Sequence, residues 1–222
     1  MLNLEKHSST IIFDLDGTLV DSLNGIGLAM KKTLAEFGYD IKIDNILPRI
    51  GAPMIQVVEE LTNENSSEIN RIYEHYLNIY RKDYLHEILP LDGANNLIDN
   101  LYKNHFSLAI VTNKTEYDAK SVIKELNWIK QFKIIVGRDT KKLPKPYPEG
   151  TIYALNRWNS EPQNSIFVGD TEYDMAAGKN AGVKSLIGLL GSRNASQLKN
   201  AGATHIASNL VEVEEIILHR WE

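Results

Sequence analysis

The sequence Thr10-Ile11-Ile12-Phe13-Asp14-Leu15-Asp16-Gly17-Thr18 is the most informative about the fold, because it places two carboxylates directly after an apolar run. The run predicts a buried strand, and α/β folds bind their ligands at the carboxyl ends of such strands. The Asp-Gly turn twists the chain out of strand alternation, so Asp14 and Asp16 can converge on one ligand. One acid can then attack the ligand while the other transfers a proton. An ordinary Asp-Gly turn is the alternative interpretation of residues 14–18 taken alone.

Three further segments follow the same pattern, in which polar or charged residues come at or beyond the end of an apolar strand. Ser107-Leu108-Ala109-Ile110-Val111 runs into Thr112-Asn113-Lys114, and Ser165-Ile166-Phe167-Val168 runs into Gly169-Asp170-Thr171-Glu172-Tyr173-Asp174. Between them, Lys145-Pro146 lies in a proline-punctuated loop some distance after the strand candidate 134–137. Each segment alone has a simple structural explanation: a threonine at a strand end, a solvated lysine before a proline, or a Gly-Asp turn that caps a helix.

In this order, the four segments resemble the four motifs of the haloacid dehalogenase-like hydrolase superfamily, and the resemblance covers nearly the whole chain. The segments 13–22, 111–114 and 169–171 are most similar to the phosphoglycolate phosphatase-like subfamily. One departure is Tyr147, which follows Lys145 and Pro146 where relatives more often have a small polar or acidic residue or a histidine. This departure leaves the expected catalytic residues in place and bears on which substrate the protein binds.

Composition sets limits on the class of protein. A chain of 222 residues with 43% hydrophobic content can bury a sizeable core, either as one large domain or as a domain with an insertion. The absence of cysteine excludes a disulfide framework and thiol catalysis. No apolar run suits export or a membrane span, so we expect a cytoplasmic location and no membrane partner. The net charge of −5 and the scattered basic residues disfavour nucleic acid as a partner, and the oligomeric state is not indicated.

The spacing of apolar residues predicts the fold class. From residue 92 onward, helix and strand signals alternate. We expect strands at 106–112, 133–137, 165–168, 184–188 and 204–207. We expect helices at 92–104, 115–127, 172–181 and 195–201, a further helix that begins at 148, and a closing helix that ends at 218. Such alternation predicts an α/β fold with a doubly wound parallel sheet. The segment between the first motif and about residue 88 has helix signals only, and the resemblance implies that it is an inserted all-α cap. We expect a Rossmann-like catalytic core at 1–20 and 89–222, a helical cap at 21–88, and hinges at 19–22 and 85–92.

Two features of the predicted cap bear on function. The apolar stripe of 69–80 includes Tyr73, Tyr76 and Tyr80, and we expect these tyrosines to pack a small helical bundle rather than to contact a ligand. The segment Pro48-Arg49-Ile50-Gly51-Ala52-Pro53 is expected to face the active site. There Arg49 could hold a substrate carboxylate or a second phosphate, although an ordinary surface arginine is the alternative.

A phosphate monoester dianion placed among Asp14, Asp16, Asp170 and Asp174 requires a cation. Like charges about 4 Å apart repel by roughly 4 kcal/mol per pair at an effective dielectric constant near 20. Carboxylates together with a phosphate oxygen form a hard oxygen site, which favours Mg²⁺. The resemblance implies that Asp14 and Asp170 bind the metal directly and that Asp16 contributes its backbone carbonyl. It implies that Asp174 lies near the metal site without binding the ion directly. Lys145 supplies the remaining positive charge.

The resemblance also implies a reaction on a small phosphorylated metabolite. Asp14 attacks phosphorus and forms an aspartyl phosphate, while Asp16 protonates the leaving alcohol and then takes a proton from the attacking water. The Thr112 hydroxyl and the Asn113 backbone N–H are expected to bind phosphoryl oxygens, and Lys145 to neutralise their charge. The expected activity is therefore that of a magnesium-dependent phosphatase.

Two alternatives remain open at this point. A sugar-phosphate mutase similar to β-phosphoglucomutase keeps both acids and the helical cap, but returns the phosphoryl group to a sugar instead of to water. A non-enzymatic receiver-type signalling domain also has an acidic cluster, a strand-end hydroxyl and a lysine. Such a domain has no helical insertion after its first strand, so the length of the chain disfavours it. The acid at Asp16 disfavours relatives that cleave carbon–halogen or carbon–phosphorus bonds, since these have no alcohol to protonate.

Overall fold

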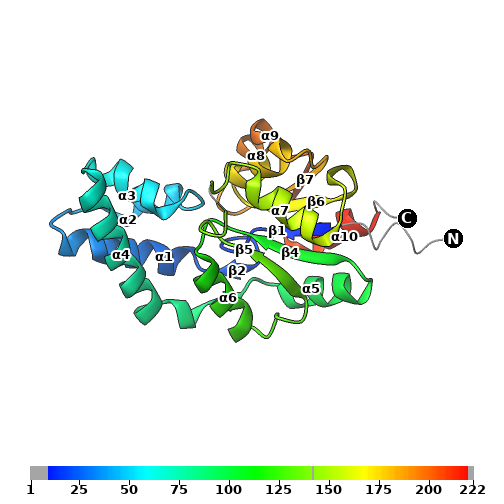
Figure 1. Cartoon of the computed structure of the whole chain (residues 1–222), viewed down its shortest axis with the longest axis horizontal. Helices are drawn as coiled ribbons and strands as arrows, with labels where there is room; N and C mark the ends of the chain where they lie inside the picture. The colour runs from blue at the N-terminus through cyan, green and yellow to red at the C-terminus, as the bar shows by residue number, and fades with distance from the viewer. Residues whose placement is uncertain (1–9, 142, 220–222) are drawn as a thin grey trace.

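The computed structural model describes residues 10–141 and 143–219. Its centre is a six-stranded sheet with the order β5-β4-β1-β6-β7-β8, and every neighbouring pair in it is parallel (Figure 1). The strands are β1 (Thr10–Phe13), β4 (Ser107–Val111), β5 (Phe132–Val136), β6 (Ile166–Gly169), β7 (Ser185–Leu189) and β8 (His205–Ala207). Strand order reverses beside β1, which is the kind of position where α/β sheets bind ligands.

Helices cover both faces of this sheet. One face carries α5 (Ala94–Lys103), α6 (Glu116–Glu125) and α10 (Leu210–His219), and the other carries α7 (Glu149–Trp158), α8 (Glu172–Asn180) and α9 (Ala195–Ala201). Strand alternation separates the two cores: Ile11 and Phe13 are buried in one apolar cluster, whereas Ile12 is buried in the other. The predicted doubly wound α/β fold is confirmed.

Residues 23–87 form the helical layer at the left of Figure 1. It contains α1 (Leu23–Glu36), α2 (Ile43–Ile46), α3 (Met54–Thr62) and α4 (Ser66–Asp83), with short 3-10 turns at Leu47–Arg49 and Leu85–Glu87. Helix α1 packs against α4 through the apolar stripes that the sequence predicts. Helix α4 begins after Asn65, whose side-chain oxygen accepts hydrogen bonds from the first-turn N–H groups.

Two very short strands join this helical layer to the sheet. Strand β2 (Val20–Asp21) pairs antiparallel with β3 (Leu89–Pro90), in the register Val20 to Pro90 and Asp21 to Leu89. Both strands fall inside the segments predicted as hinges, where the sequence showed no strand signal. The pairing holds the two connections side by side. In the ranges 10–141 and 143–219, the helices lack the combination of length and apolar content needed to cross a membrane.

Candidate active site

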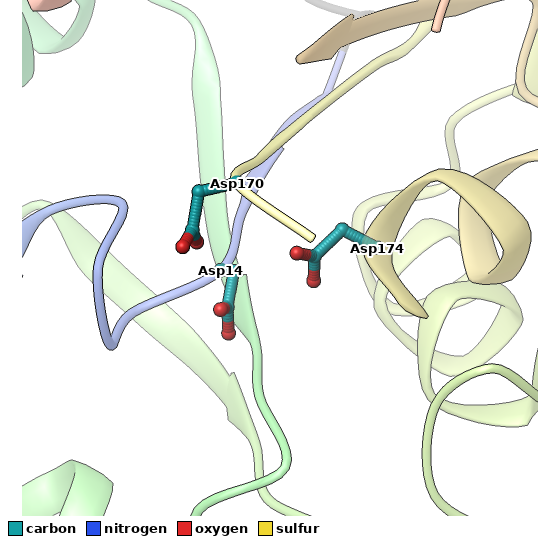
Figure 2. Close-up of side chains that lie close together, drawn as sticks. All are labelled: Asp14, Asp170 and Asp174. Atoms are coloured by element: carbon teal, nitrogen blue, oxygen red, sulfur yellow. The ribbon is translucent and has the colours of Figure 1, made fainter. Parts of the chain in front are cut away.

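Three buried carboxylates meet at the carboxyl edge of the sheet (Figure 2). Asp14 follows β1, Asp170 follows β6, and Asp174 lies in the first turn of α8. Each offers an oxygen atom, and these oxygens all lie within 4.8 Å of one another. The three acids come from distant parts of the sequence, and they meet because β1 and β6 are neighbours in the parallel sheet.

Asp14 is the acid with the most strongly perturbed environment. It is 4% exposed, and its Oδ1 has no hydrogen-bond partner of good geometry although Nζ of Lys145 lies only 2.7 Å away. Burial raises the pKa of Asp14 to about 8; the Lys145 charge opposes this, and the charges of Asp174 and Asp170 add to it. Lys145 alone therefore does not compensate the negative charge of Asp14 and its two acidic neighbours.

Asp170 is fully buried and is held by two hydroxyl groups. Thr18 donates to Oδ1 over 2.6 Å, and Ser192 donates to Oδ2. Burial raises the pKa of Asp170 to about 6, and the neighbouring Asp174 adds to the shift. Gly17 is required beside it, because its φ of +82° suits glycine and a Cβ there would lie 2.6 Å from Oδ2 of Asp170.

Asp174 and Lys145 form the other side of the cluster. Nζ of Lys145 lies 2.5 Å from Oδ1 of Asp174, while Oδ2 accepts hydrogen bonds from both the N–H and the hydroxyl of Thr171. Burial lowers the pKa of Lys145, but Asp14 and Asp174 outweigh it and raise that pKa above its usual range. Lys145 therefore stays charged, and both carboxylate oxygens of Asp174 have partners within the protein.

The cluster fits a divalent cation of the magnesium type. Three carboxylates face a single ammonium group, and Oδ1 of Asp14 is buried without a hydrogen bond of good geometry. Magnesium prefers one or two carboxylates together with water and phosphate oxygens, so Asp14 and Asp170 would hold it, with Asp174 behind them. The Asp16 carboxylate lies outside this cluster, which leaves only its backbone carbonyl as a donor of the kind that the resemblance implies.

The Asp16 carboxylate is bound instead by Ser22 and Lys114, which do not belong to the acidic cluster. Ser22 donates to its Oδ1 over 2.6 Å, and Nζ of Lys114 lies 3.0 Å from the same oxygen. Lys114 also donates to the Tyr80 hydroxyl over 2.7 Å, and its ammonium lies 4.5 Å from the centre of that ring. Lys114 belongs to the motif 111–114, but its place in the sequence alone indicated no role. In the structure it links Asp16 to helix α4.

Thr112 and Asn113 lie beside the carboxylates, after β4. Both are buried and line the same cleft as Asp14 and Asp16. The Asn113 side chain donates to the carbonyl oxygens of Gly51 at 2.8 Å and Lys145 at 3.1 Å, and its own oxygen accepts from the Lys145 N–H at 3.0 Å. Asn113 thus fixes the lysine loop and ties the segment around Gly51 to the sheet.

A cleft opens between the helical layer and the two acids Asp14 and Asp16. Its side toward the helices, which we call the cap wall, consists of apolar and phenolic side chains: Ile26, Ile50, Ala52, Met54, Tyr73, Tyr76, Leu77 and Tyr80. The three tyrosines are buried, as expected for packing, but they also line the cleft, which their helical spacing did not predict.

The structure does not bring Arg49 to this cleft. The neighbouring residues Ile50 and Gly51 do line it, which agrees with the expectation that their segment faces the site. Arg49 itself turns away, because its guanidinium is held by the carbonyl of Asn45 and by Glu60, at 3.4 Å. A contact between Arg49 and a substrate therefore has no support in this structure, and the alternative of a surface arginine describes it better.

Comparison with known proteins agrees with this geometry. The family model described as haloacid dehalogenase-like hydrolase matches residues 11–187. The chain is 36% identical to a phosphoglycolate phosphatase of Aquifex aeolicus over 186 residues, which cover 82% of this chain and 84% of that protein. It is 34% identical to pyrophosphatase PpaX of Listeria monocytogenes over 78% of this chain and 79% of that protein. A crystal structure titled as a predicted phosphatase from Clostridium acetobutylicum superimposes with a TM-score of 0.87 at 28% identity, covering 96% of this chain and 99% of the other. The chain belongs to the haloacid dehalogenase-like hydrolase family.

Proposed function

We propose that this protein is a magnesium-dependent phosphatase that hydrolyses a small phosphomonoester through a phosphoryl group carried on Asp14. The observation that carries the proposal is the buried cluster of Asp14, Asp170 and Asp174, in which Lys145 lies between Asp14 and Asp174. Such a site has excess negative charge when empty, so it suits a dication and a phosphoryl group together. The relatives named above are phosphatases, which supports the same reaction class.

Asp14 and Asp16 divide the chemistry between them. A carboxylate oxygen of Asp14 forms a bond to phosphorus as the ester P–O bond breaks, and Asp16 gives its proton to the departing alkoxide. Water then attacks the phosphorus, Asp16 takes the proton of that water, and the bond between Asp14 and phosphorus breaks. General acid–base assistance of this kind contributes roughly 100- to 10,000-fold. Ser22 and Lys114 position the Asp16 side chain for both transfers.

The remaining residues bind the phosphoryl group. The Thr112 hydroxyl and the Asn113 backbone N–H donate to its oxygens, and Lys145 neutralises charge that develops during transfer. Magnesium, held by Asp14, Asp170 and the Asp16 carbonyl, would add electrostatic stabilisation of the phosphoryl oxygens. We place the boundary between the catalytic core, 1–20 and 89–222, and the cap, 21–88, at the β2–β3 pair.

A sugar-phosphate mutase is the second candidate, and one observation favours it: the cap wall faces Asp14 and Asp16 with apolar and phenolic groups, which would limit access of water. The two candidates differ in the acceptor of the phosphoryl group. Purified protein with Mg²⁺ should release inorganic phosphate from small phosphomonoesters and from p-nitrophenyl phosphate, and Asp14→Asn should abolish the release. Conversion of a hexose 1-phosphate to its 6-phosphate without phosphate release would favour the mutase.

A further inference from the structure

The cap wall lies where it can contact the leaving group of the substrate, whereas the acidic cluster would contact only the phosphoryl group. If the proposed function holds, Asp16 gives its proton to the leaving oxygen, so the leaving alcohol lies on the Asp16 side of the cleft. That side is closed by helix α4, because Lys114 contacts both Asp16 and Tyr80. Asn113 also bonds the carbonyl of Gly51 over 2.8 Å. The wall is therefore docked onto the core and faces the leaving group.

The cap wall is uncharged. Residues 21–88, all of which the structure describes, place every lysine and arginine away from the cleft lining. Arg81 is bound by Asp118, which lines the cleft, and its guanidinium is bidentate to that carboxylate, with contacts of 2.7 and 3.2 Å. Arg49 is turned toward Glu60. The cap therefore offers a leaving group no cation in this docked arrangement.

The core side of the cleft supplies a single lining cation among the described residues, and it is already compensated. Lys114 lies 3.0 Å from Oδ1 of Asp16, and its ammonium also faces the Tyr80 ring and hydroxyl. Lys145 lies between Asp14 and Asp174 and is used by the phosphoryl site. Arg138 lies behind Tyr73, donating to its hydroxyl over 3.1 Å, and does not line the cleft. A carboxylate or a second phosphate on the leaving group would thus lose its hydration without meeting an uncompensated cation of the cleft lining, which strongly disfavours a charge at this place.

The tyrosines supply the contacts that a neutral group would use. The Tyr76 and Tyr80 rings stack at 5.8 Å with an angle of 18°, and Tyr73 lies 6.1 Å from Tyr76. Burial raises the pKa of Tyr76 well above its usual value and that of Tyr80 to about 12, so both phenols remain neutral hydroxyl groups at physiological pH. Aromatic faces pack against carbon skeletons, and phenols hydrogen-bond to alcohols.

We propose that the substrate is the phosphate monoester of an uncharged alcohol, whose carbon skeleton lies against Tyr76, Leu77 and Met54 of the cap wall. This inference rests on the proposed phosphatase function and refines its substrate class. It also separates this chain from the substrates that the names of its relatives suggest, since phosphoglycolate and pyrophosphate both carry a negative charge on the leaving group.

The test compares two substrates that differ only at the distal end of the leaving group, 2-phosphoglycolate and 2-hydroxyethyl phosphate. With Mg²⁺ and the full chain, we expect kcat/KM for 2-hydroxyethyl phosphate to exceed that for 2-phosphoglycolate at least tenfold. Equal values, a preference for 2-phosphoglycolate, or a higher kcat/KM for pyrophosphate than for 2-hydroxyethyl phosphate would overturn the inference while leaving phosphatase activity established. No phosphate release from these substrates or from p-nitrophenyl phosphate would overturn the proposed function itself.

A cation placed on the cap wall should reverse the preference. Met54 is half-buried at the start of α3 and lines the cleft, so Met54→Arg should shift the ratio of the two kcat/KM values at least tenfold toward 2-phosphoglycolate. Met54→Gln controls for the change of shape, and Gln56→Arg adds the same charge to the exposed face of α3. An unchanged ratio in a folded Met54→Arg protein would contradict contact between the wall and the leaving group. The comparison of the two substrates on the unmodified protein remains decisive if that variant does not fold.

Discussion

Replacing Asp14 by asparagine should abolish turnover and yet stabilise the metal-free protein. The substitution keeps the shape of the side chain and removes a charge that the folded state holds poorly. Asp14 is buried beside Asp170 and Asp174, and its pKa is about 8 in the folded protein against 3.8 for an ordinary aspartate. Between these two values the folded state binds a proton that the unfolded state has released. The stability of the unmodified protein must therefore fall as the pH rises through this range.

The size of this effect follows from the shift. Each pH unit between the two pKa values costs the folded state about 1.4 kcal/mol. At pH 7, roughly three units above the unfolded pKa, the penalty on the free energy of unfolding is on the order of 4 kcal/mol. Asparagine has no such penalty at any pH. For a chain of this length, 1 kcal/mol corresponds to roughly 2–4 °C, so the melting temperature of Asp14→Asn should be higher by about 10 °C.

The assay is thermal unfolding of both proteins in chelator between pH 4 and pH 8. The two melting temperatures should nearly coincide at pH 4 and diverge steadily as the pH rises. Adding Mg²⁺ should raise the melting temperature of the unmodified protein and narrow the gap, because a bound dication compensates the same charges. A variant that is no more stable at pH 7, or a difference that does not grow with pH, would show that the folded protein does not raise the pKa of Asp14.

Three further predictions test other parts of the site. Asp16→Ala should reduce hydrolysis of alkyl phosphates at least tenfold more than hydrolysis of p-nitrophenyl phosphate, because the aryl leaving group does not need a proton; equal losses in kcat would argue against acid catalysis. Gly169→Ala should lower the free energy of unfolding by about 1–3 kcal/mol and reduce kcat, because a Cβ there would lie 2.3 Å from the Cβ of Asp174. An unchanged denaturant midpoint and an unchanged kcat would show that the backbone near Gly169 shifts to accommodate the methyl group. Removing Mg²⁺ with a chelator should stop phosphate release and adding it back should restore the rate, whereas full activity in chelator would exclude the metal from the reaction.

The sheet and its helices could be predicted closely from the sequence, because parallel strands buried on both faces leave continuous apolar runs. Helix α9 has the predicted bounds, 195–201, and β4 differs from the prediction by one residue at each end. The short elements could not be predicted. Strands β2 and β3 have two residues each, and α2 has four, so none is long enough to show a periodic pattern.

The candidate site was predictable where it depends on strand ends and unpredictable where it depends on side-chain direction. Asp14 and Asp170 meet because the sheet order brings β1 and β6 together. The side chain of Asp16 points away from them, toward Lys114, and this depends on the geometry of the Gly17 turn. The direction of Arg49 depends on a local carboxylate, Glu60, one helical segment away. Such choices between nearby partners leave no trace in residue spacing.

The central claim is that the phosphoryl group passes through Asp14. Rapid quenching of the full chain with Mg²⁺ and a slowly hydrolysed phosphomonoester, followed by peptide mass spectrometry, tests it directly. We expect an acid-stable, base-labile phosphoryl group on the peptide that contains Asp14, formed before phosphate is released and absent from Asp14→Asn. A phosphoryl group on any other residue, or phosphate release at full rate from Asp14→Asn, would show that Asp14 does not carry the phosphoryl group.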